Sequence, residues 1–253
     1  MLRFLRSRKT VSPPPQLPEG IRIYAIGDIH GRADLLKEMF DVIDRDLGQN
    51  PVSRPIEVYH GDYIDRGPNS AQTLDLLIER RRGRTTVFLK GNHEAYFLEV
   101  LSDATRLEDW QEFGGLETML SYGVQPMLNA NAAEQLELVR LLNDALPEEH
   151  LDFLCSLQPS FVCGDYFFVH AGVRPGIPLS QQQEADLLWI RNEFLDSDAN
   201  FGKFVVHGHT PVRQPDRRTN RINIDTGAYA TGNLTLLRIE GSNMLSYRTG
   251  LKA

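Results

Sequence analysis

Acidic, amide and imidazole side chains recur in five short, glycine-containing segments of this 253-residue chain. The segments are Asp28-Ile-His30, Asp62-Tyr-Ile-Asp65, Asn92-His93, His170 and His209. Each follows an apolar stretch, so five strand ends each deliver Asp, Asn or His into a loop. Oxygen and nitrogen ligands without cysteine favour divalent ions such as Mn²⁺, Fe or Zn²⁺. A carboxylate that bridges two such ions about 3.5–4 Å apart is a known arrangement for phosphoryl transfer.

Each segment taken alone is ambiguous. Asp28 and His30 would share one face of a strand if the strand continued through them, but this triplet is common. Asp62 and Asp65 could instead hydrogen-bond the backbone of a turn. Asn92 could be the N-cap of a helix. The metal site is therefore predicted from the coincidence of the five segments.

The elements that position these segments follow from the pattern of apolar residues. Three units of strand, loop and helix are predicted, at 21–26 with 33–47, 56–59 with 71–82, and 85–89 with 95–101. A mainly helical insertion covers about 103–157, and short strands follow at 161–163, 166–169, 204–206, 221–224 and 233–239. This order predicts an α/β fold with ligands at the carboxyl ends of strands.

Composition excludes several classes of protein. Asp and Glu outnumber Lys and Arg by 34 to 27, which argues against a nucleic-acid partner. No run approaches the roughly 18–20 apolar residues of a membrane helix, and no secretory signal is evident, so we expect a cytoplasmic protein. The prolines before Ile21 predict a flexible arm over 1–20, followed by a single catalytic domain over 21–253. Cys155 and Cys163 are predicted to be buried free thiols.

The ordered segments resemble the signature blocks of the calcineurin-like metallophosphoesterases. The similar blocks are Gly27-Asp-Ile-His-Gly31, Gly61-Asp-Tyr-Ile-Asp-Arg-Gly67, Gly91-Asn-His-Glu94, His170-Ala-Gly172, Trp189-Ile-Arg-Asn-Glu193, His207-Gly-His-Thr-Pro211 and Ile224-Asp-Thr-Gly-Ala228. Within that family the chain is most similar to the phosphoprotein (serine/threonine) phosphatases, in their bacterial and phage lambda phosphatase-like branch. The resemblance runs from about Ile21 to Ile239. It implies two packed β-sheets, a central β-sandwich flanked by helices.

The resemblance also implies roles for polar side chains of these blocks. Two divalent ions, with Mn²⁺ favoured and Fe or Zn²⁺ as alternatives, would be held by Asp28, His30, Asp62, Asn92, His170 and His209. Asp62 would bridge the ions. Arg66 and Arg191 would bind the phosphate, with help from the amide of Asn92. His93, oriented by Asp65, would protonate the leaving group while metal-bound hydroxide attacks in line.

Three functions are compatible with these blocks. We expect a phosphomonoesterase, foremost a protein serine/threonine phosphatase, with phosphotyrosine as a further substrate. A bis(5'-nucleosyl)-tetraphosphatase-like enzyme is the alternative, because the stretch Trp110–Gly123 resembles both bacterial groups. An inactive metal- or phosphate-binding module is the third, although it would need no leaving-group acid. Substrates are thus phosphorylated proteins or small phosphoesters, and the sequence is silent on oligomeric state.

A few residues carry secondary predictions. His207 is the alternative ligand to His209, His60 is expected in the core, and His150 at the surface. The basic run Arg80–Arg82 is interpreted as a helix end, where cations complement the helix dipole. Core positions are predicted for Phe161, Phe167, Phe168 and Trp189.

Overall fold

The strands form two five-stranded sheets in a computed structural model that describes residues 13–250; residues 1–12 and 251–253 lie outside it. The first sheet has the order β10-β9-β1-β2-β3, in which β1, β2 and β3 are parallel and β9 is antiparallel to its two neighbours. Its strands are β1 (Ile21–Ile26), β2 (Arg54–Tyr59), β3 (Thr86–Phe88), β9 (Thr235–Glu240) and β10 (Asn243–Arg248).

The second sheet has the order β4-β5-β6-β8-β7. Strands β5, β6 and β8 are parallel, while β4 and β7 run antiparallel at the two edges. Its strands are β4 (Ser160–Cys163), β5 (Tyr166–Val169), β6 (Phe204–His207), β7 (Asp216–Arg217) and β8 (Arg221–Asn223).

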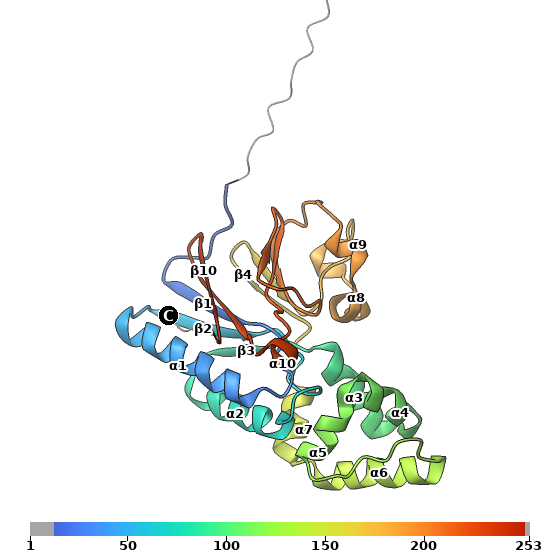
Figure 1. Cartoon of the computed structure of the whole chain (residues 1–253). Coiled ribbons are helices and arrows are strands. Elements are labelled where there is room, and N and C mark those ends of the chain that lie inside the picture. The colour runs from blue at the N-terminus through green and yellow to red at the C-terminus, as the bar shows by residue number, and fades with distance from the viewer. Residues whose placement is uncertain (1–12, 251–253) are drawn as a thin grey trace, which may run out of the picture.

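Helices flank both sheets (Figure 1). Those of the first half are α1 (Ala33–Gln49), α2 (Ser70–Gly83) and α3 (Asn92–Ser102). The insertion that follows contains α4 (Leu107–Trp110), a π-helical turn (Gln111–Gly115), α5 (Leu116–Ser121), α6 (Ala132–Ala145) and α7 (Glu148–Cys155). Short helices α8 (Glu184–Trp189) and α9 (Asn192–Leu195) lie beside the second sheet, and α10 (Ala228–Thr231) precedes β9. The predicted α/β fold with two packed sheets and flanking helices is confirmed.

Strand β1 explains how the layers are held together. Its side chains alternate, so Ile23 and Ala25 enter the core between the two sheets, while Tyr24 and Ile26 enter the core under the helices. All six residues of β1 are buried, as expected for a parallel strand covered on both faces. The loops after β1, β2 and β3 therefore leave the same edge of a rigid sheet.

Most predicted elements are present, with boundaries that are unchanged or shifted by one to three residues. Helix α3 begins at Asn92 itself, with Gly91 as the N-cap residue, so the alternative interpretation of Asn92 as an N-cap does not hold. The edge strands β7 and β10 were not predicted. Arg80 lies in the last turn of α2, as predicted, where it forms ion pairs with Asp44 and Glu57. No helix within residues 13–250 is long and apolar enough to cross a membrane.

The predicted arm over 1–20 lies partly outside the described residues, and its last part differs from the prediction. Gln16 donates its backbone N–H to Asp165 at 3.0 Å, and Leu17 donates to the carbonyl of Gly241 at 2.9 Å. The Leu17 side chain is buried in the core between the sheets. Residues 16–20 therefore pack against both sheets, and the ordered fold begins before Ile21.

Three burial predictions are wrong. Cys155 is exposed at the end of α7, while Cys163 is buried, and both are free thiols. His150 is buried, because its ring nitrogens contact Tyr122 at 2.8 Å and Asp75 at 3.1 Å. Trp189 is 41% exposed and lies at the rim of the site described below. In each case the neighbours in the sequence did not show which distant residues would cover the side chain.

Candidate active site

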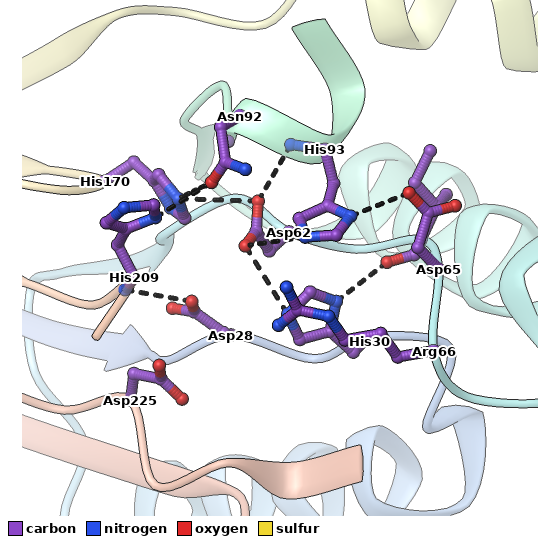
Figure 2. A network of polar contacts seen from close by, with 12 residues as sticks. Asp28, His30, Asp62, Asp65, Arg66, Asn92, His93, His170, His209 and Asp225 are labelled. Atoms are coloured by element: carbon purple, nitrogen blue, oxygen red, sulfur yellow. Dashed lines mark hydrogen bonds and ion pairs between the residues drawn. The ribbon is translucent and has the colours of Figure 1, made fainter. Parts of the chain in front are cut away.

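Loops at the carboxyl ends of β1, β2, β3, β5 and β6 bring most of the predicted side chains together (Figure 2). Figure 2 shows Asp62 in the middle, with His170, Asn92 and His209 on one side and His30, Arg66, His93 and Asp65 on the other. Apart from Arg66, which is half-buried, these side chains are buried. Residues separated by up to 181 positions in the chain thus share one polar cluster.

Backbone strain is concentrated in this cluster. Six non-glycine residues within 13–250 have a positive φ, and all but Asn129 belong to the site: His30, Asp62, Asp65, Arg66 and His209. Such conformations cost energy and persist only where surrounding contacts fix them, commonly at functional sites. Strand β1 ends at Ile26, as predicted, and His30 has a φ of 47°, so Asp28 and His30 lie in the loop and do not share a strand face.

The carboxylate of Asp62 faces a different group of ligands with each oxygen. Its Oδ1 lies 3.4 Å from Nε2 of His170, and its Oδ2 lies 3.4 Å from Nε2 of His30. On the first side, Oδ1 of Asn92 lies 2.9 Å from Nε2 of His170 and 2.9 Å from Nδ1 of His209. Ligands at right angles around an ion, each about 2.1 Å from it, lie about 3.0 Å apart. These spacings fit two cation positions that share Asp62.

Buried polar atoms without a hydrogen-bond partner in the described chain support the same fit. They include Asp28 Oδ1, Asn92 Nδ2, His93 Nε2 and His209 Nε2. Such atoms are costly unless a ligand satisfies them. Burial and the charge of Asp225 also raise the pKa of Asp28 well above its usual range. Three neighbouring buried carboxylates, those of Asp28, Asp62 and Asp225, call for cations to balance them.

The protonation states favour ligand binding on both sides of Asp62. Burial lowers the pKa of His30 to about 3 and that of His209 to about 2, which keeps both imidazoles neutral. Burial alone would raise the pKa of Asp62, but His170, His93 and His30 together hold it below the usual range. Neutral imidazole and ionised carboxylate are the forms that bind divalent ions.

The geometry distinguishes among the predicted ligands. Asp62, His170 and His209 form one compact group, with ligand atoms within 4.8 Å of one another, and His30, Asp62 and His93 form another. Asp28 belongs to neither group; its Oδ2 instead accepts the backbone N–H of His209 at 2.9 Å. The second group includes His93 in its place. The structure therefore offers two candidate ligands, Asp28 and His93, beside His30.

A hydrogen-bonded pair occupies the side of the site near His30. Nδ1 of His93 donates to Oδ2 of Asp65 at 2.7 Å, so Nε2 is the nitrogen directed away from Asp65 and toward Asp62, 3.9 Å from its Oδ2. Burial alone would lower the pKa of His93, but Asp62 and the hydrogen bond to Asp65 raise it above its usual value. A protonated, correctly directed imidazole can act as a general acid.

The two predicted phosphate-binding arginines have different surroundings. Nη1 of Arg66 lies 3.0 Å from Nε2 of His30, and its guanidinium sits between the rings of Phe113 and Tyr229, 5.4 Å and 5.1 Å from their centroids. Arg191 is exposed just before α9; burial is the main reason why the pKa values of His170 and His209 are lowered, and the charge of Arg191 adds to it. Arg66 thus contacts the polar cluster directly, whereas Arg191 is near enough for its charge to act on two histidines of the cluster.

The three histidines with alternative or supporting roles, His207, His209 and His60, differ in position. His209 belongs to one of the compact ligand groups, whereas His207 does not and packs edge-on against Phe194 at 4.9 Å. His60 is buried, as predicted, and its carbonyl accepts Nδ1 of His170 at 2.7 Å. That contact orients the His170 ring and leaves Nε2 for the site.

Several residues of the site were not predicted. Glu94 accepts backbone N–H groups of Asp62, Tyr63 and Gly91 at 2.7–2.9 Å and so links two loops. Asp225 is buried with its Oδ1 bound to the N–H of Gly227. Glu94 and Asp225 belong to blocks quoted above, so the blocks themselves were the available signal. Trp110, Phe113 and Thr118 lie in the stretch Trp110–Gly123 that was quoted for its resemblance, but no role was assigned to them, and Tyr229 had no such signal.

Comparison with known proteins agrees with this geometry. The family model for calcineurin-like phosphoesterases matches residues 21–239. The chain belongs to this family. It is therefore a metal-dependent phosphoesterase, a hydrolase whose His and Asp groups can hold metal ions.

Relatives within the family differ in substrate. The chain is 30% identical over 224 residues to serine/threonine-protein phosphatase 1 of Salmonella typhimurium, covering 86% of this chain and 92% of the relative. It is 27% identical over 235 residues to the asymmetrical bis(5'-nucleosyl)-tetraphosphatase PrpE of Anoxybacillus flavithermus, covering 84% and 88%. A crystal structure described as a diadenosine tetraphosphatase shares the fold, with a TM-score of 0.62, 20% identity and coverage of 92% and 95%.

Proposed function

We propose that this metallophosphoesterase hydrolyses phosphomonoesters, foremost phosphoserine and phosphothreonine in proteins, with phosphotyrosine as a further substrate. The observation that carries the proposal is the position of Asp62, whose two carboxylate oxygens face two separate ligand groups. In this proposal Asp28 and His30 would hold one ion, Asn92, His170 and His209 would hold the other, and Asp62 would be shared by both. Oxygen and imidazole ligands favour Mn²⁺, with Fe or Zn²⁺ as alternatives.

The chemistry that two such ions supply is a lower pKa for an attacking water and charge stabilisation on the phosphate oxygens. Arg66 and Arg191 would hold the phosphate through their planar guanidinium groups. The unpartnered Nδ2 of Asn92 is a further donor for a phosphate oxygen. Nε2 of His93 would give its proton to the leaving alkoxide, and Asp65 keeps that ring in the required orientation.

An inactive binding module is disfavoured by the pairing of His93 with Asp65. A module that only binds phosphate or metal needs no buried, raised-pKa imidazole whose free nitrogen is directed into the site. The proposal is therefore catalytic.

Substrate choice is tested by comparing phosphopeptides with a dinucleoside polyphosphate. Purified, Mn²⁺-loaded enzyme is assayed with a phosphoserine peptide, a phosphotyrosine peptide and diadenosine tetraphosphate, and kcat/KM is compared. The phosphatase relative at 30% identity supports a preference for the phosphopeptides. A kcat/KM for diadenosine tetraphosphate more than about tenfold above that for either peptide overturns this proposal in favour of the tetraphosphatase alternative, which the PrpE relative supports.

A further inference from the structure

Asp65 receives hydrogen bonds from the helical insertion as well as from His93. The indole Nε1 of Trp110 donates to Oδ2 of Asp65 at 3.0 Å, and the hydroxyl of Thr118 donates to Oδ1 at 2.6 Å. Together with His93 at 2.7 Å, three donors surround one fully buried carboxylate. Both oxygens of this carboxylate therefore act as hydrogen-bond acceptors.

The same segment also fixes the strained backbone of Asp65 and Arg66. Asp65 and Arg66 have φ values of 70° and 66°. The N–H of Asp65 is shared by the hydroxyls of Thr118 at 2.9 Å and Ser70 at 3.1 Å, and the N–H of Arg66 donates to the carbonyl of Gly114 at 2.9 Å. Gly114 has a φ of 116°, and a Cβ there would lie 2.6 Å from Cγ of Arg66. Glycine is thus required for this close approach.

We propose that Trp110 and Thr118 are positioning residues for the leaving-group acid, acting through Asp65. This inference rests on the proposed function. The indole N–H occupies the same oxygen that His93 contacts, so it limits the directions in which Asp65 can turn. The Thr118 hydroxyl fixes the other oxygen. The ring of His93 is then confined between Asp65 and the ring of Phe113, which is stacked on it at 4.6 Å.

This role predicts a dependence on the leaving group. Protonation of the leaving group strongly affects the rate for an alkyl phosphate, whose alkoxide is a poor leaving group. It has little effect for p-nitrophenyl phosphate, whose leaving group is good. Trp110→Phe keeps the aromatic ring and removes the donor. Thr118→Val keeps the shape and removes the hydroxyl, while Thr118→Ser keeps the hydroxyl and is the matched control.

The experiment measures kcat for a phosphoserine peptide and for p-nitrophenyl phosphate, together with bound Mn²⁺ and the melting temperature. We expect Trp110→Phe and Thr118→Val each to lower kcat for the peptide at least about tenfold more than for p-nitrophenyl phosphate, with metal content unchanged. Thr118→Ser should restore the ratio of the wild type. Equal losses on both substrates, or a Thr118→Ser variant no better than Thr118→Val, overturn the inference.

A double-mutant cycle separates positioning from packing. If Trp110 acts through the acid, Trp110→Phe should have no further effect on the peptide rate once His93 is replaced by Asn. Independent, multiplicative losses contradict the inference. If the Trp110 variant does not fold, the two Thr118 variants decide alone. A wild-type enzyme without activity on either phosphomonoester refutes the proposed function instead.

Discussion

Replacement of His93 by Asn separates two roles that one ring nitrogen could have. Nε2 of His93 lies 3.9 Å from Oδ2 of Asp62, within the compact group that includes His30, so it has a ligand's position. Its Nδ1 is bound to Asp65 at 2.7 Å, an arrangement found for both general acids and metal-bound histidines. The two roles predict opposite results for metal content.

We expect the acid role, with an effect that depends on the leaving group. General-acid catalysis typically contributes about 10²- to 10⁴-fold, which corresponds to about 3–5 kcal/mol of the barrier. kcat for a phosphoserine peptide should therefore fall by at least about 100-fold, and kcat for p-nitrophenyl phosphate by less than about tenfold. Asp65 keeps its bonds from Trp110 and Thr118, so the stability loss should be about 1–3 kcal/mol. This loss of stability is smaller than the loss expected when a buried charge is left without any partner.

Steady-state kinetics on the two substrates and a metal count on the purified variant test this expectation. Two ions per chain in both wild type and variant agree with the acid role. Similar losses on both substrates, together with one missing ion, would refute it and make His93 a ligand. His150→Asn is the matched control, because His150 is also buried but bonds Tyr122 and Asp75 instead.

Four further expectations follow from individual contacts and charges. Asp62→Asn should lower turnover at least about a thousandfold and reduce the metal count, and near-normal activity would disprove a bridging Asp62. Arg191→Ala should raise KM and the inhibition constant of inorganic phosphate about 10- to 100-fold, measured at full metal loading. Because the pKa of His93 is raised, wild-type activity on the phosphoserine peptide should persist above pH 6.5 and decline at higher pH, whereas the rate on p-nitrophenyl phosphate should lack this decline. Burial lowers the pKa of His60 to about 4, so below about pH 6.5 the unfolded chain binds a proton that the folded chain does not. The free energy of unfolding should therefore fall by about 3 kcal/mol between about pH 6.5 and pH 4. Chemical denaturation should show a smaller fall for His60→Gln than for the wild type.

The position of a side chain could be predicted from the sequence where it depends only on the strand that precedes it. The loops after β1, β2 and β3 leave one edge of a parallel sheet, so Asp62 and Asn92 could be expected to meet. The predictions of burial were wrong where burial depends on residues that are distant in the sequence. His150 has polar neighbours but is buried under Tyr122, and Trp189 lies on an apolar pattern yet is 41% exposed. The conformation of the loop that holds Asp28 and His30 was not predicted, because His30 has a left-handed backbone that no pattern in the sequence specifies.

The contacts that orient Asp65, and through it the proposed acid His93, could not be predicted either, because they join residues distant in the sequence. Trp110 and Thr118 meet Asp65 across 45 and 53 residues of sequence, and no periodic pattern specifies such contacts. The local signals were the resemblance of the stretch Trp110–Gly123 and the pair Gly114-Gly115 within it, since a Cβ on Gly115 would lie 2.3 Å from the indole of Trp110. The proposed metal ligands come from loops at strand ends, whereas the groups that hold Asp65 come mainly from the insertion. Substitutions in the insertion should therefore change the dependence on leaving group while metal affinity stays the same.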